Sequence, residues 1–257
     1  SGGTDSHLYF GWYWGDERDL PGALGAWPRL ARFVSEFGAQ AVPTEAGFMD
    51  PAAWPDLDWE ALARTHGLQR QFLTRLGLDP WDFATFDEWR DATQRYQAQV
   101  VRHHVETLRR LKYRPAGGFC QFAFADGHPA VTWAVLDHQR EAKLGYDALA
   151  AACAPVVVIA DRPDAEYRPG APIALDVHVV SDLRSAIKGA TVTARLGWRD
   201  GEYRWRWEGD VPADECVRIG TVQALAPESD GPLTLDLELS ADGVKAANSY
   251  VSSIVTP

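Results

Sequence analysis

The spacing of apolar residues changes near Pro155, and this change limits the possible folds more than any other feature of the sequence. Before Pro155, apolar side chains in residues 87–112 recur every three to four positions, the spacing of one helix face. Asp87 is the predicted N-cap of this helix. Short apolar runs at 31–35 and 117–125 lie on either side of it, and residues 139–152 predict another helix. This strand–helix–strand–helix order predicts an α/β domain with parallel strands.

Beyond Pro155, apolar residues alternate with small or polar ones, which is the period of a β-strand. The clearest examples are Ile173, Leu175, Val177 and Val179, followed by Leu233, Leu235, Leu237 and Leu239. Further strands are predicted at 155–160, 190–198, 202–208, 216–224 and 244–255. Roughly seven short strands in about 100 residues are typical of an immunoglobulin-like β-sandwich. The sequence therefore predicts an α/β domain at residues 1–154 and an all-β domain at 155–257.

The charge balance and the cysteine pattern exclude several classes of protein. The formal net charge of −11 disfavours nucleic acid or an anionic membrane as a partner. Cys120, Cys153 and Cys216 lie far apart without a Cys-x-x-Cys pair, so neither a disulfide framework nor a zinc site is indicated. No apolar run approaches about 18 residues, and no signal peptide is recognisable. These observations favour a cytoplasmic location over secretion.

The stretch RFVSEFGAQ, residues 32–40, places the carboxylate of Glu36 at the end of an apolar run. Removing a carboxylate from water is costly unless it is paired or hydrogen-bonded. Glu36 is therefore either a structural charge, paired with a neighbour such as Arg32, or a group kept for chemistry. The residues alone leave both interpretations open.

Four blocks of the sequence resemble the C-terminal part of the catalytic barrel of β-mannosidases in glycoside hydrolase family 2. These blocks are DSHLYFGWYWG (5–15), RFVSEFGAQAVP (32–43), LDPWDFATFDEWRDATQRYQAQVVRHHVETLRRLKYRPAGG (78–118) and FADGHPAVTWAVLDHQREAKLGYDAL (124–149). VHVVSDLRSAIKGATVTARL and NSYVSSIV are similar to strands of the β-sandwich that follows the barrel in that family. The resemblance thus covers nearly the whole chain.

The resemblance implies the C-terminal part of a TIM (β/α)8 barrel, with the site at the carboxyl ends of its strands. It also implies retaining hydrolysis of terminal β-mannosides, with Glu36 as the nucleophile. Two carboxylates suffice for this reaction, so neither a cofactor nor a metal is expected. His103 and His104 do not suggest a metal site, because adjacent helical residues point about 100° apart. Sugar contacts are expected from His7, Tyr9, Trp12, Phe122, Asp126 and Trp133.

The resemblance covers only part of a barrel, because a complete one takes about 250 residues and about 150 are present here. The acid/base of the family is a glutamate that follows an asparagine, and it is expected outside this chain. We consider an expressed fragment, a split or processed enzyme, and a decayed homologue. In each case the exposed strand edges predict that an N-terminal barrel half, or a second copy of the chain, covers them.

The segment expected to form the last barrel strand departs from the family, which has a Trp-Gln-Leu-Asn-Asp run there. This chain has Phe122, Ala123, Phe124, Ala125 and Asp126. The loss of the amides removes hydrogen-bonding capacity, so other exo-β-glycosidases, acting on galactosides, glucuronides or glucosaminides, remain alternatives. A non-catalytic carbohydrate-binding or interaction module is a further alternative of a different class.

The stretch EYRWRWE, residues 202–208, alternates with period two and so belongs to a strand. Tyr203, Trp205 and Trp207 share one face of this strand, and Arg204 and Arg206 share the other. The simplest interpretation is a sandwich strand with its aromatic face in the core. A sugar-binding platform is the alternative.

Overall fold

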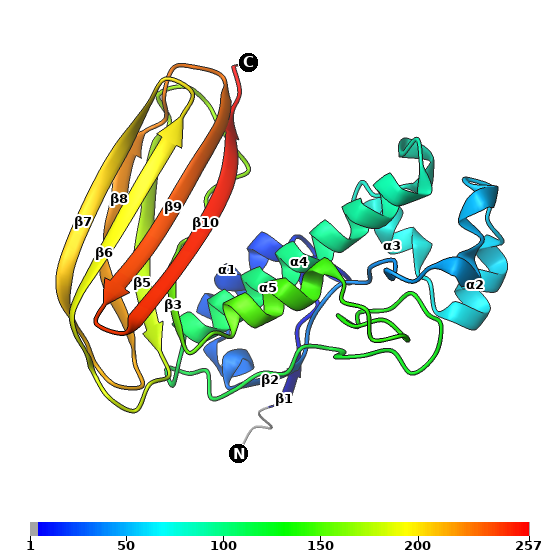
Figure 1. Ribbon diagram of the computed structural model, residues 1–257, viewed down its shortest axis with the longest axis horizontal. Helices are drawn as coiled ribbons and strands as arrows, with labels where there is room; N and C mark the ends of the chain where they lie inside the picture. Colours follow the sequence, from blue (N-terminus) through cyan, green and yellow to red (C-terminus); the bar gives the residue numbers. More distant parts are fainter. Residues whose placement is uncertain (1–4, 257) are drawn as a thin grey trace. The chain divides into compact units, whose positions relative to one another are not determined.

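The computed structural model describes residues 5–256 of the chain. The protein divides into two compact units, and the boundary between them lies between Cys153 and Ala154 (Figure 1). Unit 1 contains the helices, and unit 2 contains two β-sheets.

Over residues 5–153, unit 1 has five α-helices, two short strands and five 3-10 turns. The strands are β1 (Asp5–His7) and β2 (Phe33–Glu36). The α-helices are α1 (Leu20–Ala26), α2 (Trp59–His66), α3 (Arg70–Arg75), α4 (Phe86–Arg110) and α5 (Leu144–Ala152). The 3-10 turns span Glu17–Asp19, Pro28–Ala31, Gly47–Met49, Pro51–Ala53 and Pro80–Asp82.

The two strands of unit 1 are parallel, but β1 was not among the predicted strands, which were 31–35 and 117–125. Asp5 lies opposite Phe33, and His7 lies opposite Glu36. The predicted strand 117–125 is not a regular strand, although Phe119 forms a parallel bridge with Val34 on the other side of β2. Within residues 5–153 the described sheet has two strands and does not close into a barrel. An eight-stranded barrel therefore remains a prediction.

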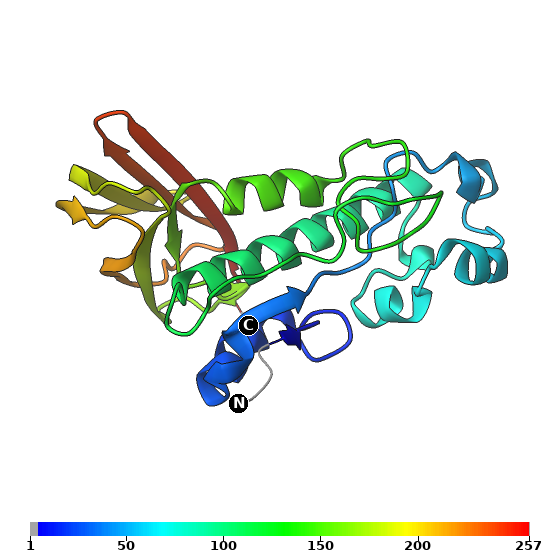
Figure 2. The same ribbon diagram turned by 90° about the horizontal axis from the view of Figure 1, so that it is seen from below.

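Helix α4 is the longest helix of unit 1, and α5 packs alongside it (Figure 2). Its N-cap is Thr85 and not the predicted Asp87. The Glu88 N–H donates to the Thr85 hydroxyl at 3.2 Å, and the Glu88 carboxylate accepts from the Thr85 N–H at 3.3 Å. This reciprocal pair is a capping box. Asp87 therefore lies in the first turn, where the positive end of the helix dipole stabilises a negative charge.

The starts of α2 and α5 differ in how they are stabilised. Asp58 is the N-cap of α2, as is typical of an aspartate before an apolar run, and its side chain accepts from the Ala61 N–H at 2.9 Å. The helix predicted at 139–152 begins only at Leu144. Residues 137–142 form a turn instead, in which Asp137 accepts from the backbone N–H groups of Gln139 and Glu141.

Unit 2 is a β-sandwich of a five-stranded and a three-stranded sheet, which confirms the predicted sandwich. Its strands are β3 (Val156–Ala160), β4 (Glu166–Tyr167), β5 (Pro172–Ser181), β6 (Ile187–Trp198), β7 (Gly201–Val211), β8 (Cys216–Leu225), β9 (Gly231–Ala241) and β10 (Val244–Ile254). The larger sheet has the order β4-β10-β9-β6-β7, and the smaller has the order β3-β5-β8. The two-residue strand β4 was not predicted.

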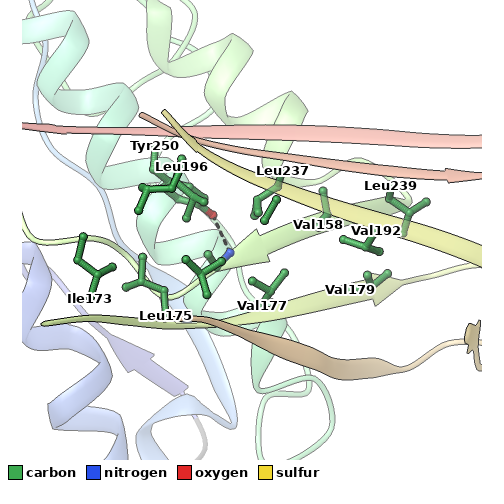
Figure 3. Close-up of a cluster of buried hydrophobic side chains, with 14 of the residues drawn as sticks. Val158, Ile173, Leu175, Val177, Val179, Val192, Leu196, Leu237, Leu239 and Tyr250 are labelled. Carbon is green, nitrogen blue, oxygen red and sulfur yellow. Dashed lines mark hydrogen bonds between the residues drawn. The ribbon is translucent and has the colours of Figure 1, made fainter. Parts of the chain in front are cut away.

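The inward-facing residues of both sheets form one apolar core (Figure 3). Val177 from the smaller sheet and Leu237 from the larger have no exposed surface. Burying a side chain of this size contributes about 1.5–3 kcal/mol. The Tyr250 hydroxyl reaches into this core and accepts from the Ala160 N–H at 3.2 Å, so a tyrosine can be buried there without an unsatisfied oxygen.

Strand β7 resolves the alternative raised by EYRWRWE. Trp205 and Trp207 pack against the sandwich core, as the simpler interpretation predicts. Arg204 and Arg206 lie on the outer face and pair with Glu202 and Glu208. Two of the three aromatic residues on this face are therefore used for packing, whereas Tyr203 is 43% exposed.

Candidate active site

Two parallel strands bring Glu36 and His7 to the same edge of the small sheet. The Leu8 N–H donates to the Glu36 carbonyl oxygen at 2.8 Å. On the other side of β2, the Phe122 N–H donates to the Phe37 carbonyl oxygen at 3.0 Å. Because parallel neighbours have their carboxyl ends at one edge, three segments of the chain deliver side chains to the surroundings of Glu36.

Glu36 is a partly exposed carboxylate that accepts a hydrogen bond from a tyrosine. The Tyr9 hydroxyl donates to Oε2 of Glu36 at 2.9 Å, and Nδ1 of His7 lies 3.4 Å from the same oxygen. The Glu36 side chain keeps 30% of its surface exposed. An O–H donor stabilises the charged form of a carboxylate. Within residues 5–256 no ion pair joins Glu36 to Arg32, so the structural pairing considered for this acid is absent there.

Tyr9 is held in its protonated form. Only 6% of its surface is exposed. Burial raises the pKa of the phenol far above its usual value, and the hydrogen-bonded carboxylate of Glu36 raises that pKa further. Tyr9 therefore remains a donor to Glu36 at every ordinary pH.

His7 lies between two carboxylates. Its Nδ1 faces Glu36, and its Nε2 lies 3.7 Å from Oδ2 of Asp5. The Ser35 hydroxyl donates to the other oxygen of Asp5. At these distances the contacts of His7 are electrostatic and not well-formed hydrogen bonds. The structure thus places His7 beside the candidate nucleophile, with 51% of its side chain exposed.

Tyr9, Phe122 and Trp133 form an aromatic wall near Glu36. The Tyr9 ring lies edge-on to Trp133 and Phe122, with centroid distances of 6.2 and 6.5 Å, and Phe122 lies 5.7 Å from Trp133. Phe122 is 38% exposed and offers ring surface to a ligand. Gly38 (φ +145°) makes this arrangement possible, because a Cβ at that position would lie 2.9 Å from the Phe122 carbonyl oxygen.

Trp12, which was expected to contact sugar, has no exposed surface. Its indole N–H donates to the side chain of Gln69 at 3.2 Å, and its ring packs 6.1 Å from that of Trp133. This burial argues against a direct sugar contact. It is consistent with a supporting position behind the aromatic wall.

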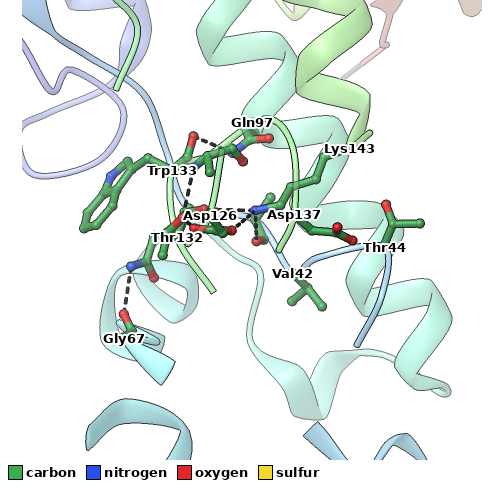
Figure 4. A network of polar contacts seen from close by, with 12 residues as sticks. Val42, Thr44, Gly67, Gln97, Asp126, Thr132, Trp133, Asp137 and Lys143 are labelled. Carbon is green, nitrogen blue, oxygen red and sulfur yellow. Dashed lines mark hydrogen bonds and ion pairs between the residues drawn. The ribbon is translucent and has the colours of Figure 1, made fainter. Parts of the chain in front are cut away.

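Asp126 is also buried, with 6% of its surface exposed (Figure 4). Its Oδ1 accepts from the Thr132 hydroxyl at 2.5 Å, and its Oδ2 lies 3.7 Å from Nζ of Lys143. Both oxygens of this carboxylate thus face side chains of the protein. The arrangement argues against the expected sugar contact of Asp126.

Lys143, Gln97 and Gln121 were not identified from the sequence. Gln97 Nε2 donates to the carbonyl oxygens of Ala39, Trp133 and Ala134 at 2.9, 3.2 and 3.3 Å. Gln121 Nε2 donates to the Trp133 carbonyl oxygen at 2.9 Å. For Gln97, the only signal in the sequence was a glutamine at an apolar position of the helical pattern of α4. Such a residue is common on helix surfaces, so the pattern does not distinguish a buried one.

The rest of the described chain offers few other functional groups. Among residues 5–256 no cluster of three His, Cys, Asp or Glu side chains could hold a metal ion. No helix in the same range is long and apolar enough to cross a membrane. Unit 2 has a hollow of about 1030 Å³ on the outer face of the larger sheet. Arg195 and Asp236 line this hollow and pair with each other, so its charges are largely satisfied within the sheet.

The chemistry available at Glu36 is that of a partly exposed carboxyl group beside an apolar wall. Such a group can attack an electrophilic carbon or stabilise a positive charge that develops on a sugar ring. It cannot also protonate the leaving group in the same step. A retaining glycosidase therefore needs a second carboxyl group about 5–5.5 Å away.

Two solved structures with this fold align over nearly the whole chain. The β-D-mannosidase from Dictyoglomus thermophilum aligns with 98% of this chain at a TM-score of 0.69 and 18% identity. The exo-chitosanase CsxA from Amycolatopsis orientalis aligns with 97% at a TM-score of 0.69 and 19% identity. At such identities the likeness shows the fold alone. No protein-family model and no curated protein sequence matches the chain.

The aligned region is a minor part of both solved structures. The chain spans 31% of the length of the β-D-mannosidase and 30% of the length of the exo-chitosanase. A further structure of CsxA, described as an exo-β-D-glucosaminidase, aligns with 86% of this chain at a TM-score of 0.60 and 18% identity. The similar structures thus include enzymes named for two different sugars.

Proposed function

We propose that this chain is the nucleophile-bearing region of a retaining exo-β-glycosidase of the glycoside hydrolase family 2 type. The observation that carries the proposal is the hydrogen bond from the Tyr9 hydroxyl to Glu36 at the carboxyl end of β2. This bond orients the carboxylate of Glu36 while 30% of its side chain remains exposed. The fold shared with a β-D-mannosidase and an exo-chitosanase supports the same conclusion.

In the proposed reaction, Glu36 attacks the anomeric carbon of a terminal β-glycoside. The bond between that carbon and the leaving oxygen breaks, and a second carboxylic acid gives its proton to the leaving oxygen. Water then attacks the covalent glycosyl-enzyme, and the same second group removes its proton. We place this acid/base outside residues 1–257, as the resemblance implies, and we place the aromatic wall against the sugar.

The proposal also assigns a role to the free edge of β1. In the described sheet, β1 pairs with β2 on one side only. A free edge presents unpaired N–H and C=O groups. We propose that a further barrel strand, supplied by another part of the full-length protein or by a partner chain, pairs with this edge.

The test of the nucleophile is the substitution Glu36→Ala in the full-length protein, assayed on an aryl β-mannoside. Loss of the covalent step should reduce kcat by at least about 10⁴-fold. Sodium azide should restore turnover and form the α-glycosyl azide, because a small anion can attack from the vacated side. Glu60→Ala is the matched control, since this glutamate is exposed on α2. Near-normal activity of Glu36→Ala would refute the assignment.

Substrate preference is a separate question. We propose β-mannosides as the substrate, with β-glucosaminides as the second candidate because an exo-β-D-glucosaminidase shares the fold. A panel of aryl β-mannoside, glucosaminide, galactoside and glucuronide should give the highest kcat/KM for the mannoside. Absence of hydrolysis with retained sugar binding would instead favour a non-catalytic carbohydrate-binding function.

A further inference from the structure

Lys143 is a lysine whose side chain has no exposed surface. It immediately precedes α5, and its Nζ donates to the carbonyl oxygens of Ala41 and Thr132 at 3.2 and 3.4 Å (Figure 4). The same Nζ lies 3.7 Å from Oδ2 of Asp126. The ammonium group thus makes two hydrogen bonds to carbonyl oxygens and an electrostatic contact with the carboxylate of Asp126.

The groups bound by Lys143 belong to the two backbone segments that surround the candidate site. Ala41 lies in the segment that continues from Glu36, and Thr132 directly precedes Trp133. The Ala41 N–H donates to the Thr132 carbonyl oxygen at 3.1 Å, so Lys143 binds where the two segments already meet. Asp126 reinforces this junction, because it accepts from the Thr132 hydroxyl at 2.5 Å.

The position of Trp133 has consequences for Glu36. Its carbonyl oxygen accepts from Gln97 and Gln121, and the carbonyl oxygen of the preceding Thr132 accepts from Lys143, so two successive peptide groups are held by side chains. Its ring packs edge-on against Tyr9, and the Tyr9 hydroxyl donates to Glu36. A shift at Thr132 would therefore reach the carboxylate through two contacts, Trp133 to Tyr9 and Tyr9 to Glu36.

We propose that Lys143 and Asp126 form a positioning pair, which holds Trp133 against Tyr9 and so orients the sugar-facing wall and the carboxylate of Glu36. The inference rests on the proposed function of Glu36. Neither member of the pair touches the sugar. A buried ion pair is weak evidence for stability, because desolvation offsets its attraction, so the role proposed for this pair is positioning.

The surroundings of Lys143 make this pair sensitive to pH. Burial lowers the pKa of Lys143 to about 8, while the charges of Asp126 and Asp137 act in the opposite direction. Arg140 contributes a third charge nearby and donates to the backbone carbonyl of Asp126 at 2.6 Å. The pair is intact below the folded-state pKa, and it is lost as the pH rises through about 8. Above that pH the ammonium charge of Lys143 is lost from this buried position.

The test compares Lys143→Met and Asp126→Asn with the control Lys188→Met, whose lysine is 76% exposed on β6. In the full-length enzyme, each change in the pair should lower kcat/KM about 10–100-fold, mainly through kcat, because misplaced groups cost rate more than binding. The loss of activity that follows the titration of Lys143 near pH 8 should disappear in Lys143→Met, and it should move to lower pH in Asp126→Asn, because Asp126 raises the pKa of Lys143. The double variant should be no slower than the slower single one. Unchanged kcat/KM and an unchanged alkaline limb in a folded variant would overturn the proposal.

A second measurement does not depend on catalysis. The indole N–H signal of Trp133 in an NMR spectrum can be assigned by its absence in Trp133→Phe. In the wild type this signal should shift as the pH passes through about 8, and in Lys143→Met it should not. If Glu36→Ala retains activity while this shift is seen, the proposed function fails and the positioning pair stands. If the wild-type signal does not move, the pair does not position Trp133.

Discussion

The two units of this protein bury different kinds of side chain. In the part of the chain that the structure describes, the buried polar side chains of unit 2 are Ser181 and Ser252, whereas unit 1 has thirteen, among them Gln97, Asp126 and Lys143. Part of the reason lies in the backbone. The sheets of unit 2 satisfy their own N–H and C=O groups through strand ladders. In unit 1, the irregular segments 37–46 and 117–143 need side chains for the same purpose.

This difference separates the framework from the site. Regular elements leave little freedom for placing a functional group, because their hydrogen bonds follow a fixed pattern. The irregular segments of unit 1 carry Gly38, Phe122 and Trp133 to the neighbourhood of Glu36. Their buried polar groups are therefore needed to hold the site. We expect substitutions in unit 2 to lower stability through lost apolar burial, and substitutions in unit 1 to lower it through lost hydrogen bonds.

The largest effect on stability should come from the core of unit 2. Leu237→Ala removes a side chain with no exposed surface from the centre of the larger sheet. The lost burial and the remaining cavity should lower the free energy of unfolding of this unit by about 2–5 kcal/mol. Chemical denaturation followed by hydrogen exchange of β6 and β9 measures it.

The matched control for this change is Leu225→Ala on β8, where the leucine is 61% exposed. The control should change stability by less than about 0.5 kcal/mol. Equal losses in the two variants would mean that burial between the sheets does not hold unit 2 together.

A smaller loss should follow from removing one polar group in unit 1. Gln97→Leu keeps the approximate volume but withdraws the donor from the carbonyl oxygens of Ala39 and Ala134. Leaving buried carbonyls without a donor should cost about 1–3 kcal/mol, even though the new side chain is more apolar. Hydrogen exchange in α4 and α5 reports the change, and Arg95→Leu, at an exposed position of α4, is the control.

The sign of this effect is what distinguishes the units. If Gln97→Leu stabilises the protein, the irregular segments do not depend on side-chain donors, and the contrast between the units is wrong. A loss of stability confined to unit 1 would support the contrast between the two units.

The smallest effect should come from a surface charge in unit 2. Arg218 and the Thr221 hydroxyl bind the Asp176 carboxylate and lower its pKa to about 2. The stability from this group is present above the unfolded-state pKa and is lost as the pH falls towards about 2. Because Asp176 is largely solvent-screened, its loss should cost less than about 1 kcal/mol.

This prediction is checked by unfolding Asp176→Asn and the wild type at pH 7 and at pH 2.5. The two proteins should differ slightly at neutral pH and less in acid. Asp242→Asn, in the exposed turn between β9 and β10, should show no difference at either pH. A difference that grows in acid would contradict the sign of the shift.

The alternation of apolar residues was sufficient to predict the sandwich, because a strand with one buried face repeats every two residues whatever its neighbours are. The same holds for α4, whose length and apolar stripe were predicted, although Thr85 and not Asp87 caps it. Which residue caps a helix depends on the direction from which the chain enters it. The apolar pattern alone does not distinguish Thr85 from Asp87, since both side chains can accept a hydrogen bond. The nucleophile candidate Glu36 was found only because the surrounding blocks resemble a known family.

What the sequence determined by itself is the period of each segment, and with it the change from helices to strands near Pro155. Only the tertiary structure decided which polar side chains are buried. Trp12 and Asp126, expected at the sugar, lie within the protein, while Lys143, which the sequence did not single out, joins the segments around Glu36. The physical reason is that periodicity records which face of an element avoids water. The hydrogen-bond partners of an irregular backbone are set by residues distant in sequence, and no local pattern records them.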